Sequence, residues 1–158
     1  MTSHSIKTVE DLKLVVFSYT QRWRIEELHK TLKSGACRVE ETQLQTKDRV
    51  IKWATIMVAV ASRIERIKRL SRQQPHEPAS VELSQHEIRA LIKLKRLQKK
   101  RTETISDAEP SIEQATRWLA ELGGYTGKSS GGPPGSITIR RGLDYIAPVA
   151  LLIKAGEL

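Results

Sequence analysis

Near the start of the chain, side chains able to contact phosphate or hold a metal ion recur at helical spacing. They are Tyr19, Arg22, Glu26 and Lys33. On a helix, at about 100° per residue, these positions fall within roughly 60° of one another. A carboxylate flanked by cations and a phenol suits a divalent ion held beside a phosphate backbone. The other interpretation is an ordinary amphipathic helix in which Glu26 simply forms an ion pair with Arg22.

A helix from Val9 to Lys33 is predicted to position these residues. Thr8 is a good N-cap, acidic residues follow it in the first turn, and Gly35 ends the helix. An apolar stripe lies about 120° away from Glu26 and its neighbours. It consists of Leu14, Phe17, Ile25, Leu28 and Leu32. One face is therefore expected to pack into a core while the other presents the polar groups.

The order of these residues carries a resemblance. Tyr, two residues, Arg, three residues, Glu, six residues and Lys resembles the Y-R-E-K signature of the cut-and-paste DDE transposases of the insertion-sequence-four family (Tn-five type). The local segment R-W-R-I-E-E-L-H-K, which starts at Arg22, is also similar to that family. The resemblance implies that Glu26 is the third carboxylate of a site in which two Mg²⁺ or Mn²⁺ ions support DNA cleavage and strand transfer. It also implies that Tyr19, Arg22 and Lys33 contact the phosphates of the transposon end, with Trp23 stacking near the cleavage site.

The chain departs from the family pattern in its other carboxylates. In the family these are two Asp residues well upstream, on strands of a ribonuclease-H-like fold. Here Asp11 alone precedes Glu26, within the same predicted helix, whereas Asp48, Asp107 and Asp144 follow it. We therefore expect the C-terminal part of such a transposase, inactive alone and without a tightly bound metal ion of its own.

The expected architecture is mainly α, with about five helices. Residues 1–34 would be the end of the ribonuclease-H-like core, and residues 35–158 a helical C-terminal region for dimerisation and DNA contact. The second helix is predicted from about Lys47 to Arg72. Its apolar first half, residues 50–61, is expected to be deeply buried and its basic second half to emerge at the surface. Trp53 is assigned to the core.

Local signals predict the third and fourth helices. Ser84 and Glu87 form a capping box that opens the third helix, which is expected to reach about Lys100. The fourth helix is predicted over residues 111–122 and stops at Gly123.

A last helix is expected to start near Thr138 and to be kinked or restarted at Pro148. A short strand over residues 136–140 is the alternative at its start. The order of the short motifs LGGY, PPG and RRG in this region also resembles the C-terminal end of the same transposase family.

The overall charge favours a polyanionic partner. The chain of 158 residues has 27 Lys and Arg against 18 Asp and Glu, a net charge of +9, which is typical of nucleic-acid binding. The single cysteine, Cys37, excludes an internal disulfide and suits a reducing compartment. The longest apolar run, residues 53–61, is far short of the roughly 20 residues of a membrane span. With the resemblance, the expected partners are DNA at transposon ends and a second transposase protomer, with no membrane, in a bacterial cytoplasm and on the nucleoid when bound to DNA.

Two other function classes fit the sequence. A chain that keeps the family's C-terminal helices could pair with intact transposase and inhibit it, or bind DNA without sequence preference. Glu26 and His29 also form the E-x-x-H pattern of di-iron helix bundles. That interpretation needs a second such pair, and His86 and Glu87 have the wrong spacing.

Overall fold

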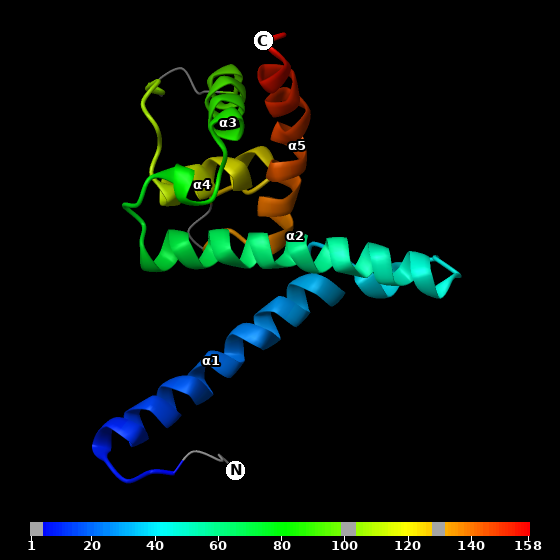
Figure 1. Ribbon diagram of the computed structural model, residues 1–158. Coiled ribbons are helices and arrows are strands. Elements are labelled where there is room, and N and C mark those ends of the chain that lie inside the picture. The colour runs from blue at the N-terminus through cyan, green and yellow to red at the C-terminus, as the bar shows by residue number, and fades with distance from the viewer. Residues whose placement is uncertain (1–4, 99–103, 128–131) are drawn as a thin grey trace.

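The chain is mainly helical, as predicted, in a computed structural model that describes residues 5–98, 104–127 and 132–158 (Figure 1). No strand occurs within those ranges, where pairing between strands is limited to one isolated bridge between Pro78 and Ser111. None of the described helices is both long enough and apolar enough to cross a membrane. In chain order the elements are α1 (Val9–Lys33), the 3₁₀ turn η1 (Val39–Glu41), α2 (Lys47–Gln73), the 3₁₀ turn η2 (Ala79–Val81), α3 (Gln85–Leu97), α4 (Ile112–Leu122) and α5 (Ser136–Ala155).

The predicted caps set the starts of two helices. Thr8 Oγ1 accepts a hydrogen bond from the Asp11 amide at 3.1 Å, and the Asp11 carboxylate accepts one from the Thr8 amide at 2.9 Å. Ser84 and Glu87 repeat this reciprocal arrangement at the start of α3. Both are capping boxes, which satisfy amides that have no partner inside the helix.

Two other helix predictions are corrected or left open. The chain from Ser136 onward is one continuous α-helix through Pro148, so the alternative strand at its start and the restart at Pro148 are wrong. The reason is a helical rather than a two-residue spacing of the apolar groups, because Ile139, Ile146 and Ile153 all face the core. The predicted end of the third helix at Lys100 lies outside the described residues.

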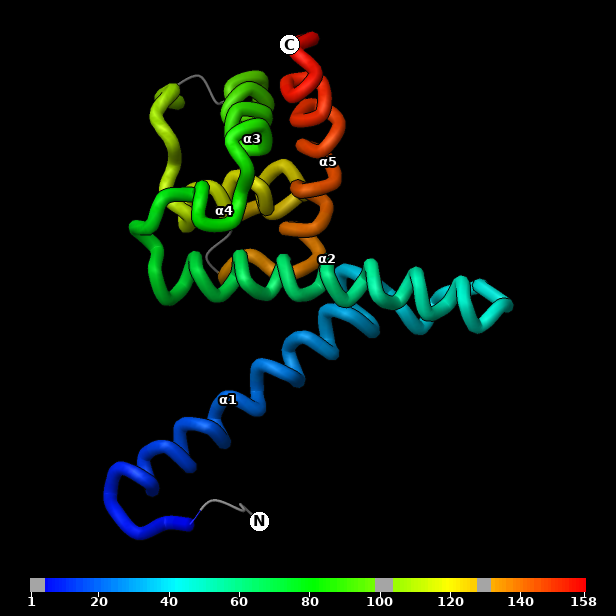
Figure 2. Tube along the Cα trace, viewed as in Figure 1, coloured from blue at the N-terminus to red at the C-terminus, as the bar shows by residue number. Residues whose placement is uncertain are grey.

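The core lies where α4 and α5 pack on the C-terminal half of α2 and α3 packs in turn on α5 and α4. Figure 2 shows α3 and α5 side by side, with α4 running across them along α2. Large side chains that are fully enclosed come from all four helices: Ile64, Ile67, Leu91, Ile112, Leu119, Ile139 and Ile146. Burial of this apolar surface is the main force that holds the four helices together.

Glycine allows α4 and α5 to touch through their backbones. A Cβ added at Gly142 of α5 would lie 3.0 Å from Leu119 Cα in α4, and closer still to the Leu119 carbonyl group. A Cβ added at Gly123 would collide in the same way with the carbonyl of Thr138. Side chains at these two points would therefore push the helices apart.

The prediction for α2 is wrong about which half is buried. Ile64 and Ile67, in the basic half, are fully buried, whereas Ile51 and Ile56, in the apolar half, are more than half exposed. Trp53, expected in the core, is half-buried and outside the core cluster. The reason is the position of the partner helices: α4 and α5 pack on the second half, where one apolar stripe is enough to form the contact and the cations point away from it.

Helix α1 extends away from the four-helix body, and its C-terminal part crosses α2 (Figure 1). The contact there is polar, because the buried Thr31 hydroxyl donates a hydrogen bond to the Glu65 carboxylate of α2. The expected apolar face does not enter a core: Leu14, Phe17 and Ile25 are each more than half exposed. The side of α1 that meets α2 is therefore mainly polar, and of the apolar stripe the half-buried Leu28 lies beside α2.

Candidate nucleic-acid interface

Three of the four signature residues form one exposed cluster on α1. Arg22 Nη1 lies 2.8 Å from Glu26 Oε1, and the Arg22 guanidinium carbon lies 5.6 Å from the centre of the Tyr19 ring. These contacts follow from the helix itself, because residues three and four positions apart lie on the same face. Tyr19, Arg22 and Glu26 therefore present a cation between an aromatic ring and a carboxylate.

The cluster faces solvent and is held weakly. Tyr19 is 70% exposed, and the Glu26 side chain is 43% exposed. An exposed ion pair of this kind contributes only about 0.3–0.5 kcal/mol. A phosphate oxygen approaching this face can therefore replace Glu26 as the partner of Arg22 at little cost, and that exchange leaves the carboxylate available to another ligand.

Lys33 stands apart from this cluster. It lies on the same side of α1 but about two turns beyond Glu26, and its Nζ is 3.3 Å from Glu40 Oε1 at η1. Both side chains are well exposed. The structure therefore brings together Tyr19, Arg22 and Glu26, and it pairs Lys33 with a different carboxylate.

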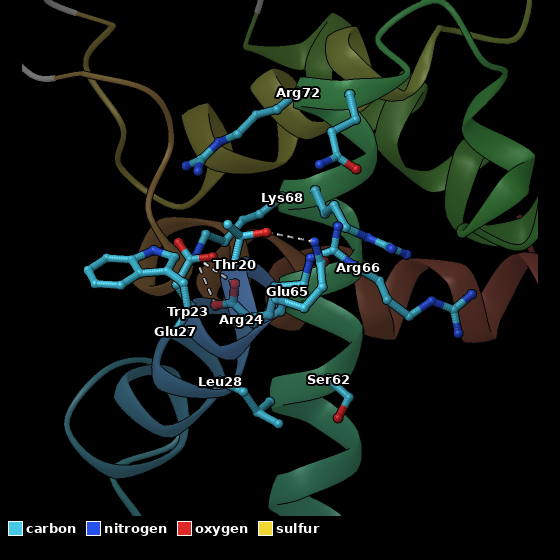
Figure 3. A pocket seen from close by; sticks show the side chains of 13 residues that line it. Thr20, Trp23, Arg24, Glu27, Leu28, Ser62, Glu65, Arg66, Lys68 and Arg72 are labelled. Atoms are coloured by element: carbon cyan, nitrogen blue, oxygen red, sulfur yellow. Dashed lines mark hydrogen bonds and ion pairs between the residues drawn. The ribbon is translucent and has the colours of Figure 1, made fainter. Parts of the chain in front are cut away.

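A cationic groove runs between α1 and α2, on another side of α1 (Figure 3). Its volume is about 470 Å³. Five cations line it, against the two carboxylates of Glu27 and Glu65. The cations are Arg24 from α1 and Arg66, Lys68, Arg69 and Arg72 from α2.

Several of these charges are already neutralised inside the protein. Lys68 Nζ lies 2.8 Å from both oxygens of Glu65. Arg66 Nη2 lies 2.7 Å from Glu82 Oε2, an ion pair whose geometry is not that of a hydrogen bond. The remaining three cations, Arg24, Arg69 and Arg72, form no ion pair with any residue that the structure describes. The groove therefore keeps an excess of positive charge.

Trp23 connects the two faces of α1. Its indole is 65% exposed and lines the groove, and it also lines an adjoining hollow of about 430 Å³. That hollow contains Glu26 and Lys30 and reaches the start of α5 at Ser136. A flat aromatic ring in this position offers a stacking surface beside both sets of cations.

Glu26 is the residue that the sequence predicts as a metal ligand. Within residues 5–98, 104–127 and 132–158, no group of three or more His, Cys, Asp or Glu side chains is close enough to hold a metal ion. Asp144 is paired with Arg140 on α5 at 2.8 Å, and Asp11 lies four turns along α1 from Glu26. Two adjacent metal ions need several converging oxygen ligands, so the described residues do not form such a site by themselves.

Cys37 is part of the packing rather than a reactive group. It is buried just after α1, with its Sγ 3.5 Å from the carbonyl oxygen of Met57 in α2. Burial raises the pKa of the Cys37 thiol above its ordinary value, against the opposing effect of Arg140. A raised pKa keeps the thiol protonated at neutral pH, and a protonated thiol is a poor nucleophile.

Sequence reasoning missed the groove although one signal was present. Arg66, Arg69 and Arg72 recur every third residue, which places them along one side of α2. The sequence marks this segment as basic, but the second wall of the groove is α1, which is far away in the chain. No family model matches the chain.

Proposed function

We propose that this chain is the C-terminal part of a cut-and-paste DNA transposase of the insertion-sequence-four type. In this proposal α1 lies against a transposon end. Tyr19, Arg22 and Lys33 bind its phosphates, and Glu26 supplies one metal-binding carboxylate to a site completed by carboxylates from elsewhere in the enzyme. Residues 1–34 then belong to the catalytic core, and residues 35–158 to a C-terminal region that contacts DNA and a second protomer.

The observation that carries the proposal is the exposed cluster of Tyr19, Arg22 and Glu26. Their spacing resembles the family signature, and their side chains meet in space on an exposed face of α1, where Glu26 also lines the hollow that reaches Ser136. A cation held loosely by a carboxylate is suited to phosphate recognition, because the phosphate can take over the cation while the carboxylate binds a divalent ion.

Fluorescence anisotropy with a short labelled duplex tests the phosphate contacts. Arg22→Gln should weaken binding about 5-fold and reduce the slope of log K against log salt by about 1, because one phosphate contact is lost. Glu26→Gln, assayed without divalent ions, should strengthen binding, because it removes a negative charge beside the phosphate. Lys13→Gln is the matched control, since Lys13 is an exposed cation on the far side of the same helix.

The form of the DNA separates a transposase from a general DNA binder. A face that holds a transposon end should prefer a linear duplex with a free 3′-hydroxyl over covalently closed circular DNA of the same sequence. Equal competition by the two forms would reduce the proposal to non-specific DNA binding. Identical salt slopes for Arg22→Gln and Lys13→Gln would contradict the phosphate contact itself.

The exposed apolar stripe on α1 favours a second candidate function, which is pairing with another protein chain. Leu14, Phe17 and Ile25 expose apolar surface along one side of a helix, as interaction sites commonly do. A regulatory chain of this kind would associate with itself or with an intact transposase. Light scattering over a concentration series measures self-association, and Phe17→Ser should lower it. A chain that stays monomeric at all concentrations would count against self-pairing.

A further inference from the structure

We propose that the cationic groove between α1 and α2 binds the phosphodiester backbone of a single nucleic-acid strand. This site goes beyond the proposed function, because none of its cations belongs to the signature set of Tyr19, Arg22 and Lys33. It lies on another side of α1, and the wall that completes it comes from α2 (Figure 3).

The charge of the groove selects an anion. Glu65 is neutralised by Lys68 and accepts the Thr31 hydroxyl hydrogen bond, so it does not compensate the remaining cations. Arg24, Arg69 and Arg72 form no ion pair within the described residues, and Arg69 and Arg72 are exposed. Guanidinium groups bind phosphate through two parallel hydrogen bonds, which makes arginine better suited than lysine to this role.

The unpaired arginines line both walls of the groove. Arg69 and Arg72 are three residues apart on α2, about 4.5 Å along its axis, and Arg24 lines the groove from α1. Cations distributed over both walls of a groove match successive phosphates of a chain better than one small anion. Such an arrangement is how proteins track a single strand without reading its sequence.

The size of the groove argues for one strand rather than two. A volume of about 470 Å³ between two helices is that of an ordinary small-molecule site, which a duplex cannot enter. The exposed Trp23 indole lines the same groove, and unpaired bases, unlike those inside a duplex, can stack on such a ring.

The test compares a labelled ten-nucleotide oligo-dT strand with a duplex of the same length, by anisotropy in a salt series. Three phosphate contacts predict a slope of about −2 for the single strand, since each contributes about 0.7. The double variant Arg69→Gln/Arg72→Gln should weaken single-strand binding at least about 10-fold at low salt and leave a slope near −0.7. The charge-matched control is Lys13→Gln/Lys154→Gln, which removes two exposed cations outside the groove.

Trp23 and Arg24 provide independent variants on the other wall. Trp23→Ala should weaken oligo-dT binding about 10-fold without changing the salt slope, and Trp23→Phe should restore part of it, because stacking does not depend on the ionic atmosphere. Arg24→Gln should lower both affinity and slope. Circular dichroism of each variant checks that the helices are intact, which is expected because these side chains are exposed.

The two nucleic-acid sites can be told apart. Arg22→Gln should reduce duplex binding and leave oligo-dT binding unchanged, and the Arg69→Gln/Arg72→Gln variant should do the reverse. If Arg22→Gln does not reduce duplex binding while the groove variants behave as expected, the transposon-end contact is refuted and the groove proposal is unaffected. The groove proposal is overturned if its double variant binds oligo-dT with the wild-type slope, or if duplex displaces the strand at equal nucleotide concentration.

Discussion

The substitution Gly142→Ala tests a close backbone contact between α4 and α5. Gly142 of α5 lies against the Leu119 carbonyl group of α4, and an added Cβ would fall well inside van der Waals contact with backbone atoms. Backbone atoms cannot swing aside as a flexible side chain can. The methyl group must therefore be accommodated by moving one helix away from the other.

The size of the effect follows from this geometry. Separating the helices by about 1 Å sacrifices up to half of the dispersion energy of the contacts that span the gap. The buried side chains of Leu119, Ile139 and Ile146 contribute to these contacts. Overpacking costs about 1–3 kcal/mol, and here the cost should reach the upper end, about 3 kcal/mol, because a backbone must move. Alanine regains about 1 kcal/mol because it favours a helix interior over glycine. The expected net loss in the free energy of unfolding is about 2 kcal/mol.

Urea denaturation followed by circular dichroism measures the loss. With an m value of about 2 kcal/mol/M, the midpoint should fall by about 1 M urea. Gly135→Ala is the control, because nothing lies within 4 Å of a Cβ added there, and its effect should stay below about 1 kcal/mol as an N-cap change. If Gly142→Ala were as stable as Gly135→Ala, the backbone contact between α4 and α5 would be refuted.

Three further predictions concern burial and titration. Burial raises the pKa of Glu87, but hydrogen bonds from Arg63 and Ser84 outweigh it and hold that pKa below its ordinary value. As the pH falls, Glu87 is therefore protonated in the unfolded chain before it is protonated in the folded one. The stabilisation is present at neutral pH and lost in acid. Glu87→Gln should therefore cost about 1–2 kcal/mol at pH 7 and almost nothing near pH 3, as measured by urea midpoints at both pH values. Ile67→Ala should destabilise the protein by about 2–5 kcal/mol and the exposed Ile56→Ala by less than about 1 kcal/mol, and equal losses would contradict the burial found for α2. The buried Cys37 thiol should react with a thiol reagent on the order of 10-fold or more slowly in the native protein than in urea, and fast native labelling would contradict its packing against α2.

Helix starts could be predicted from the sequence because their determinants are local. The Thr8 cap and the box of Ser84 with Glu87 form as predicted, and Asp11 completes a second box with Thr8; each satisfies free amides within one turn. The inner side of α3 follows for the same reason, since Ile88 faces the core through a pattern that one helix carries by itself. Such features need no knowledge of distant parts of the chain.

Burial along α2 could not be predicted, because it depends on which elements come to lie against each half. The segment around Ile56 has the more apolar composition, and yet the packing of α4 and α5 on the other half encloses Ile64 and Ile67. The points at which helices cross also depend on tertiary packing and could not be predicted from the local sequence. Nothing in the sequence around Gly142 indicates that its partner is the carbonyl of Leu119, because the two meet only once α4 and α5 cross.

The two candidate sites differ in the same respect, because one depends on local spacing and the other on tertiary packing. The clustering of Tyr19, Arg22 and Glu26 is a property of one helix and could be predicted from spacing alone. The groove needs two helices, and a buried polar contact helps to fix how they lie: the Thr31 hydroxyl meets Glu65, which Lys68 holds in place. On the helical wheel, Arg22 and Glu26 lie about 140–180° from Thr31. The contact that builds the groove on one side of α1 therefore turns the signature face away from α2 and leaves it open to solvent. One helix can in this way serve two nucleic-acid surfaces that use different cations and have Trp23 between them.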